Sequence, residues 1–219
     1  MENFFSINTV FFTVLNYPMS YIEFIGTIFN LLCVWLASRR NIWTWPTGLV
    51  AIILYFFLFY QIRLYSDLIE QIYFFIMTFY GWLLWSQGKN KDTHKVKVEK
   101  NTPIVNGMYL ISIVVLTVAL GYIMQHIHVY LPAVFPEPAT YPYLDAFTTI
   151  LSFAATILLA QKKFEAWYLW ILVDIIGIWL YYVKGVKFIA LEYAIFLGIA
   201  IHGFLIWRSK LLTQKSLNA

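Results

Sequence analysis

The chain has 219 residues, of which 61% are hydrophobic and 20% aromatic, while only 12% are charged. This composition excludes an ordinary soluble enzyme or nucleic-acid-binding domain and indicates an integral membrane protein. The formal net charge is +4, and Cys33 is the single cysteine, so we expect no internal disulfide and no cysteine zinc motif.

The predicted elements begin with residues 1–18, where bulky apolar side chains and few charges predict a helix lying in the outer membrane interface. Seven apolar runs follow, each long enough to cross about 30 Å of hydrocarbon as a helix. Their length favours helices over a membrane β-barrel, whose strands are short and alternate in polarity. The expected spans are 21–37, 45–61, 68–85, 107–127, 144–160, 167–183 and 188–207.

The connections between these runs predict the orientation in the membrane. The hydrophilic stretch 88–103 predicts a cytoplasmic linker, and four prolines in residues 131–143 predict an extended external loop. Of the 15 basic residues, 12 fall on the side of the linker and the C-terminus, and 3 fall on the other side. The positive-inside rule therefore predicts a periplasmic N-terminus and a cytoplasmic C-terminus.

The chain aligns with itself when it is shifted by 122 residues. Rare residues coincide without a gap, which favours an internal duplication of three helices. One helix lies between the copies, so the copies would run in the same direction, with a site near the midplane where they face each other. The clearest pairs are Trp45 with Trp167, Glu70 with Glu192, Gly81 with Gly203, and Trp85 with Trp207.

The expected fold is thus an all-α integral membrane protein with seven transmembrane helices. They form a 3+1+3 arrangement of two parallel three-helix repeats, preceded by the interfacial helix. The segments are the interfacial helix 1–18, the first repeat 19–86, the linker and connecting helix 87–128, the periplasmic loop 129–143, the second repeat 144–208 and the cytoplasmic tail 209–219.

The candidate site starts from WYLWILVD, residues 167–174, where Trp167, Trp170 and Asp174 share one helix face. The expected spans hold acids but no Lys or Arg, which favours a neutral or cationic substrate over an anionic one. A planar or cationic ring would stack on the indoles, with the acid below it. An interfacial aromatic belt is the alternative reading for Trp167.

Polar residues on other spans complete the candidate site. Repeat-matched acids bind substrate or tie helices together, and intramembrane amides commonly make interhelical bonds. Tyr80 continues the face of Glu70, His202 continues that of Glu192, and Gly81 and Gly203 would permit close helix packing. The candidate substrate-binding residues are Trp167, Trp170, Asp174, Glu192, Gln71, Asn30, Tyr80 and His202.

Motifs for catalysis or metal binding give no support to an enzyme. The sequence contains no HExxH motif, nucleophile elbow or phosphate loop. His126 and His128 are two residues apart, so a helix would not point them the same way, and we expect neither a metal nor a cofactor.

The residues and their spacing resemble the PnuC family of bacterial vitamin transporters, which carry nicotinamide riboside. WYLWILVD looks like that family's W-x-x-W-x-x-x-N/D signature, and QIRLYSDLIEQIYFFIMTFYGW (61–82) and GVKFIALEYAIF (185–196) look like family segments. The family often has Asn where this chain has Asp174, and some relatives have Asn where it has His202.

The resemblance implies a seven-helix 3+1+3 fold similar to SWEET sugar transporters, with its own topology, and a homotrimer in the bacterial inner membrane. It implies facilitated diffusion of nicotinamide riboside for NAD biosynthesis, with trapping by cytoplasmic phosphorylation. A SWEET-like carrier of sugar or of another small neutral or cationic solute is the alternative. Proton coupling through the acids, a membrane-embedded enzyme and a non-transporting assembly partner also stay open.

Overall fold

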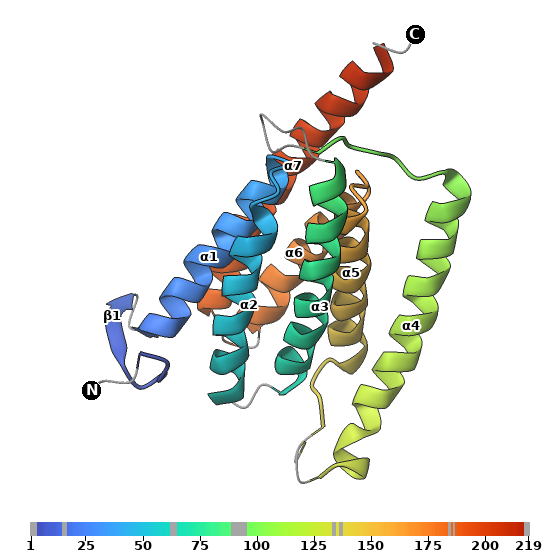
Figure 1. Ribbon diagram of the computed structural model, residues 1–219. Helices are drawn as coiled ribbons and strands as arrows, with labels where there is room; N and C mark the ends of the chain where they lie inside the picture. The colour runs from blue at the N-terminus through green and yellow to red at the C-terminus, as the bar shows by residue number, and fades with distance from the viewer. Residues whose placement is uncertain are drawn as a thin grey trace.

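The structure is a computed structural model that describes residues 4–14, 17–61, 65–88, 96–132, 135, 138–183, 185 and 187–216. In these residues a two-stranded hairpin precedes a bundle of seven helices (Figure 1). The helices are α1 (Tyr21–Ser38), α2 (Thr44–Gln61), α3 (Tyr65–Gly88), α4 (Pro103–Tyr130), α5 (Pro142–Ala160), α6 (Ala166–Val183) and α7 (Lys187–Ser216).

The N-terminal segment differs from the expected interfacial helix. β1 (Val10–Val14) pairs antiparallel with β2 (Tyr17–Ser20), so the prediction of a helix is wrong for residues 4–14 and 17–18. The sequence VFFTV in β1 consists of β-branched and aromatic residues, which favour a strand. Phe11 and Phe12 pack on Phe24 of α1, with ring centroids 5.4 and 5.2 Å apart, so the hairpin contacts α1 through aromatic rings without forming a helix.

Six of the described helices are long and apolar enough to cross a membrane, namely α1, α2, α4, α5, α6 and α7. The remaining helix, α3, has 24 residues but carries Asp67, Glu70 and Gln71 near its start. Side-chain caps mark the starts of α1 and α4. The Ser20 hydroxyl accepts from the Glu23 amide, and the Thr102 hydroxyl accepts from the Val105 amide. α7 continues to Ser216, so the predicted tail begins as helix.

We call α1, α2 and α3 the first group of helices, and α5, α6 and α7 the second. In the first group α1 contacts α2 and α2 contacts α3, and in the second α5 contacts α6 and α6 contacts α7. Two seams join the groups, one between α1 and α7 and the other between α3 and α5, while α4 packs on α5 at the outside (Figure 1). We call the end with the α1–α2 and α5–α6 turns the linker end, and the opposite end, with β1 and β2, the hairpin end.

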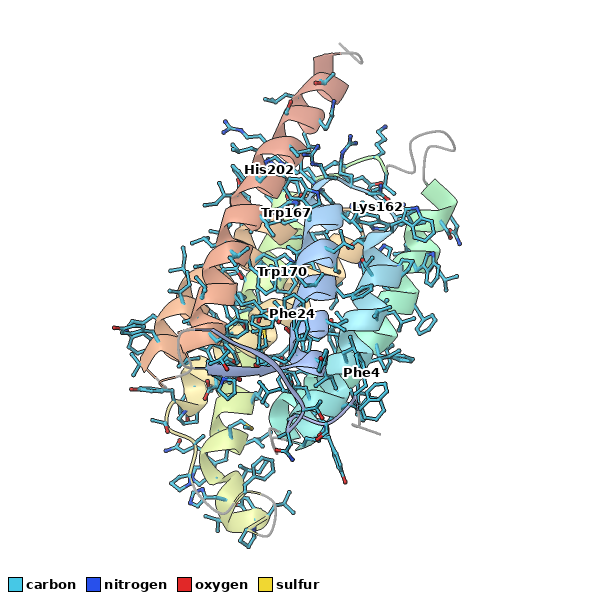
Figure 2. The ribbon with its side chains drawn as sticks, turned by 90° about the vertical axis from the view of Figure 1, so that its left-hand side faces the viewer. Phe4, Phe24, Lys162, Trp167, Trp170 and His202 are labelled. Carbon is cyan, nitrogen blue, oxygen red and sulfur yellow. The ribbon has the colours of Figure 1, made fainter. Side chains whose placement is uncertain are left out.

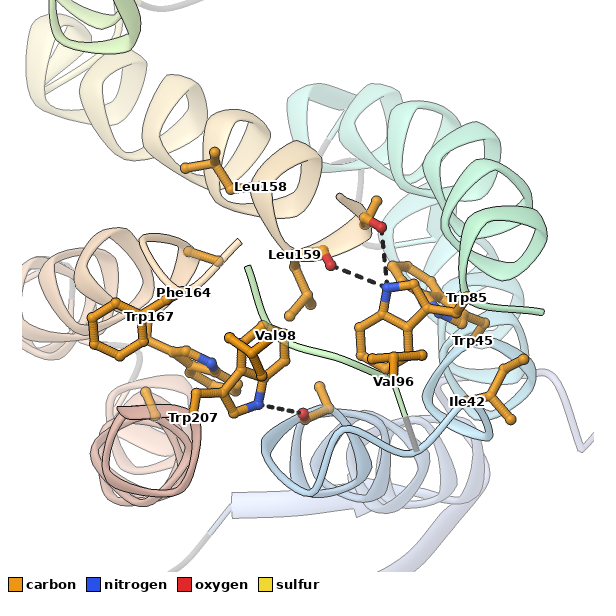
Figure 3. Close-up of a cluster of buried hydrophobic side chains, with 14 residues drawn as sticks. Ile42, Trp45, Trp85, Val96, Val98, Leu158, Leu159, Phe164, Trp167 and Trp207 are labelled. Atoms are coloured by element: carbon orange, nitrogen blue, oxygen red, sulfur yellow. Dashed lines mark hydrogen bonds between the residues drawn. The ribbon is translucent and has the colours of Figure 1, made fainter. Parts of the chain in front are cut away.

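A tryptophan-rich core joins the two groups at the linker end (Figure 3). The Trp85 indole N–H donates to the carbonyls of Leu159 and Ala160 at 3.2 and 3.1 Å, across the α3/α5 seam. The Trp207 indole N–H donates to the Ala37 carbonyl at 3.2 Å, across the α1/α7 seam. Ala37 and Leu159 are 122 residues apart, as are the two tryptophans, so the two seams are tied by matching bonds.

The paired glycines make room for the other two tryptophans of this core. A Cβ built on Gly81 would lie 2.2 Å from the Trp45 ring, and one built on Gly203 would lie 2.6 Å from the Trp167 ring. The expected close approach at Gly81 and Gly203 therefore occurs, and an indole ring is what approaches each of them.

Candidate functional site

Glu192 on α7 is buried and is bonded to the other group of helices. The Tyr55 hydroxyl of α2 donates to its Oε1 at 2.9 Å, and Asn30 Nδ2 of α1 donates to the same oxygen at 3.5 Å. The Tyr55 hydroxyl also lies 3.1 Å from Thr27 Oγ1. Buried polar groups need such partners, and one carboxylate here links three helices across the α1/α7 seam.

Glu70 occupies the matching position on α3 and makes a related contact across the other seam. Thr149 Oγ1 of α5 donates to Glu70 Oε1 at 2.5 Å, and one turn further the Tyr73 hydroxyl donates to the Phe153 carbonyl at 2.9 Å. Thr149 lies 122 residues after Thr27. Each seam therefore pairs an acid from one group with a threonine from the other, directly for Glu70 and through Tyr55 for Glu192.

We expect Tyr55→Phe to destabilise the unliganded protein. The change removes the shorter hydrogen bond to a buried carboxylate, and an unsatisfied buried group costs about 1–3 kcal/mol. Thermal unfolding in detergent measures the loss. Tyr60→Phe is the control, because Tyr60 lies on the same helix and is 62% exposed. Equal melting temperatures for the two variants would contradict the importance of the Tyr55 bond.

Asp174 is buried on α6, with only 3% of its surface exposed. Among the described residues it has no hydrogen-bond or ion-pair partner. Three residues on, Gly177 gives room to the Tyr193 ring of α7, which lies 2.4 Å from where a Cβ would be. Tyr193 also stacks on Tyr181, with centroids 5.3 Å apart. The helix face that starts at Asp174 is thus packed on α7, while the carboxyl itself keeps its hydrogen-bonding capacity.

The two tryptophans of the WYLWILVD motif have different surroundings. Trp167 is 1% exposed and packs on Gly203 and on the Trp207 ring, 5.7 Å away, so its faces contact protein. Trp170 lies farther from the linker end (Figure 2) and is half-buried. It packs on the tryptophan-rich core and on a second cluster formed by Ile113, Ile150, Leu151, Ala154 and Val173. Of the two indoles, Trp170 is the one with surface left for a ligand.

The remaining candidates lie at other places on the bundle. Gln71 lines an apolar hollow of about 330 Å³ between α2 and α3, together with side chains such as Phe56 and Phe75. Tyr80 is 40% exposed. His202 stacks in parallel on Trp35 of α1, with centroids 5.1 Å apart, and its buried Nε2 has no hydrogen-bond partner among the described residues. Of the predicted residues, the structure therefore joins Glu192 and Asn30 by a direct bond.

A second hollow of about 180 Å³ lies beside Glu192. It is formed by α1, α7 and the hairpin, with lining residues Phe12, Met19, Phe24, Thr27, Phe188, Leu191, Glu192 and Ile195. The hairpin is held here by Tyr17, whose hydroxyl donates to Glu23 Oε1 at 2.6 Å and whose ring stacks on Phe188. Burial and the neighbouring Glu23 carboxylate raise the pKa of Tyr17, so this phenol stays a donor at any physiological pH.

Tyr55 is the member of the site that sequence reasoning missed. It lies within a run of aromatic residues on α2, and nothing in that run distinguishes it from its neighbours. The internal alignment also pairs it with Gly177, so it falls where the two copies differ. Its role becomes visible only when α2 and α7 are placed together.

The chain is similar in sequence to known membrane transporters. Residues 20–209 match the sequence profile of the nicotinamide mononucleotide transporter family. The chain is 32% identical over 209 residues to the nicotinamide riboside transporter PnuC of Escherichia coli, covering 87% of this chain and 86% of that protein. It is 26% identical over 202 residues to the riboflavin/roseoflavin transporter RibM of Streptomyces davaonensis, covering 91% of that protein.

The fold is also that of a solved relative. The crystal structure of the vitamin B3 transporter PnuC superposes with a TM-score of 0.70 at 22% identity, covering 88% of this chain and 83% of that one. The matched profile runs from the start of α1 into α7, and these relatives are named as transporters. The chain is therefore a multi-pass membrane protein that belongs to the nicotinamide mononucleotide transporter family.

Proposed function

We propose that this protein carries nicotinamide riboside across the bacterial inner membrane, with Asp174 and Trp170 at its binding site. The observation that carries the proposal is the buried Asp174 carboxyl, which has no partner among the described residues. Nicotinamide riboside contains a planar pyridinium cation. An acid offsets its charge, and an indole stacks on its ring. The nicotinamide riboside transporter of Escherichia coli, 32% identical to this chain, supports the same substrate.

The other candidates complete this proposal. Glu192 and Asn30 are bonded directly to each other, and Glu192 is also bonded to Tyr55. In the proposal, Glu192 accepts hydrogen bonds from the ribose or the carboxamide, and Asn30 donates to them. Trp167 would close the site toward the linker end from its place beside Gly203. Gln71, Tyr80 and His202 enter the proposal on their helix faces and on the family resemblance alone.

The proposed mechanism is facilitated diffusion by alternating access between two parallel repeats in a 3+1+3 arrangement. The matching bonds of the two seams support it, because Trp85 and Trp207, and Glu70 and Glu192, hold equivalent places. The groups would part at one end of the seams while they stay closed at the other. A carrier moves between such states only through a difference in substrate affinity. α3 would be the seventh span, and the resemblance to SWEET transporters stays at this level.

Direction and trapping follow from charge. The basic linker end would face the cytoplasm by the positive-inside rule. The predicted spans hold no Lys or Arg, so a phosphorylated product would find no cation along the path. Cytoplasmic phosphorylation would therefore retain the vitamin for NAD biosynthesis.

We further propose a homotrimer. α4 supports an assembly face, because only 11% of its most apolar stretch is buried within one chain. The mass of the detergent-solubilised complex, with detergent subtracted, would distinguish a trimer from a monomer with a lipid-covered α4.

Titration calorimetry on purified protein tests the substrate. We expect micromolar or tighter binding of nicotinamide riboside, and no binding of the mononucleotide or of glucose. Binding of glucose without binding of the riboside would favour a SWEET-like sugar carrier over a vitamin transporter. Loss of riboside binding in folded protein would overturn the vitamin assignment. In proteoliposomes, accumulation of the riboside driven by a pH gradient would show proton coupling and would contradict facilitated diffusion.

Riboflavin is the second candidate substrate, because the riboflavin/roseoflavin transporter RibM aligns with 92% of this chain. Riboflavin is an uncharged planar ring at neutral pH, so it would use the indole of Trp170 without needing the charge of Asp174. Binding of riboflavin and not of the riboside in the same titration would favour this candidate.

A further inference from the structure

Residues 96–101, which we call the strap, cross the linker end as an extended segment. Their side chains alternate, because Val96 and Val98 are each 1% exposed while Lys97, Glu99 and Lys100 face outward. A period of two is what an extended chain gives. Figure 3 shows the strap running between the two groups, with Val96 beside Trp85 and Val98 near Leu159 and Trp207.

The strap is bonded by its backbone to both groups of helices. On the first group, the Val96 N–H donates to the Arg40 carbonyl at 3.1 Å, and Arg40 Nη1 donates to the Val96 carbonyl at 3.0 Å. On the second, the Glu99 N–H donates to the Lys162 carbonyl and the Phe164 N–H donates to the Glu99 carbonyl, both at 2.9 Å.

The two turns that receive the strap are built alike. Arg40 in the α1–α2 turn has a φ of 60°, and Lys162 in the α5–α6 turn has a φ of 62°. These residues are 122 positions apart. A left-handed conformation costs a non-glycine residue about 1–2 kcal/mol. Both turns nevertheless have such a residue at the equivalent position, so the two turns share this backbone feature. The strap thus bridges two equivalent turns, one from each group of helices.

Side-chain bonds strengthen the contact between the strap and the second group of helices. Lys163 Nζ lies 2.6 Å from Glu99 Oε2, and the Asn101 N–H donates to Glu165 Oε1 at 3.1 Å. The hydrogen bond from Lys163 lowers the pKa of Glu99 from its usual 4.5. The pKa falls because the ion pair stabilises the charged carboxylate, so the contribution of this pair is present above pH 4.5 and is lost only as the pH falls through the lowered value.

We infer that the strap is an intramolecular latch, which holds the two groups together at the linker end and must leave at least one of them when that end opens. Parting the α1/α7 and α3/α5 seams here would pull Arg40 away from Lys162. The strap is bonded to both, so its backbone bonds to one side must break, and Val96 or Val98 must leave the tryptophan-rich core. The inference rests on the proposed alternating access, and it adds a gate on the cytoplasmic side.

The test measures access to the core beneath the strap. In a Cys33→Ser background, Ala37→Cys places a reporter at the α1/α7 seam, where Ala37 is 3% exposed. Inside-out membrane vesicles are treated with a membrane-impermeant maleimide. We expect Val96→Ser with Val98→Ser to speed labelling about fivefold or more by favouring local opening. Lys97→Ser with Lys100→Ser is the matched control on the outward side of the strap and should label at the parent rate.

Equal labelling rates for the two double variants in folded protein would overturn the latch. If the valine variant fails to fold, Glu99→Gln provides a second test on an exposed side chain. We expect it to label about twofold faster, and salt on the order of 0.5 M to speed the parent but not this variant, because salt screens the exposed ion pair. No change in either would also overturn the latch. The labelling needs no substrate, so it stays readable if riboside binding fails.

Discussion

Asp174→Asn is expected to weaken nicotinamide riboside binding about tenfold or more, which corresponds to at least about 1.4 kcal/mol. The amide keeps the size of the carboxyl and removes the negative charge that would offset the pyridinium. The same change should leave the melting temperature of the unliganded protein unchanged or raise it. Asp174 as a residue is 3% exposed and has no partner among the described residues, and a buried unpaired charge opposes folding.

Two measurements decide this prediction. Calorimetry compares the riboside with its reduced, uncharged form, whose affinity should change little in the variant. Thermal unfolding without ligand compares the variant with the parent. Riboside binding at parental affinity would remove Asp174 from the site. A lower melting temperature would instead show that the Asp174 carboxyl stabilises the folded protein, as we expect of the Glu192 carboxylate through its bonds to Tyr55 and Asn30.

Gly203→Ala is expected to destabilise the protein by about 1–3 kcal/mol or to prevent folding, because it overpacks a closed core. Its Cβ would lie 2.6 Å from the Trp167 ring. That ring is 1% exposed and packs against Trp207, so it has no free space to move into. Thermal unfolding of purified protein, together with expression yield, measures the effect.

Gly198→Ala is the matched control on the same helix, since a Cβ there would have nothing within 4 Å. Alanine in an open helical position is neutral or stabilising by about 0.5–1 kcal/mol. Adding Trp167→Phe to Gly203→Ala should recover part of the lost stability, because the smaller ring relieves the contact. Equal stability of the two alanine variants would show that the Trp167 ring is free to shift.

The sequence predicted much of this fold because long apolar runs have few stable alternatives in a membrane. The pairing of Glu70 with Glu192 and of Trp85 with Trp207 likewise followed from a simple shift of the chain. The hairpin was missed because a short apolar run such as VFFTV does not by itself distinguish a strand from a helix. Its pairing partner and its contact with Phe24 decide the outcome.

The parts of the site that escaped prediction depend on contacts between distant residues. Tyr55 and Glu192 are 137 positions apart, and no local pattern marks their bond. The sequence of the strap predicts a hydrophilic linker, because lysines surround its two valines. Only the tryptophan-rich core from both groups of helices makes Val96 and Val98 buried residues.

The tryptophan bonds at the linker end also affect the helix ends that they contact. Trp85 donates to Leu159 and Ala160, which end α5, and Trp207 donates to Ala37 in the last turn of α1. The Ala37 and Leu159 carbonyls also accept from the Arg40 and Lys162 amides of the following turns, both at 2.9 Å, so each indole adds a second bond at a helix end of the other group. Apolar surroundings offer an indole N–H no other acceptor. Parting the groups here therefore requires water to enter and accept from the two indole N–H groups, so this end of the protein is hydrated when it is open.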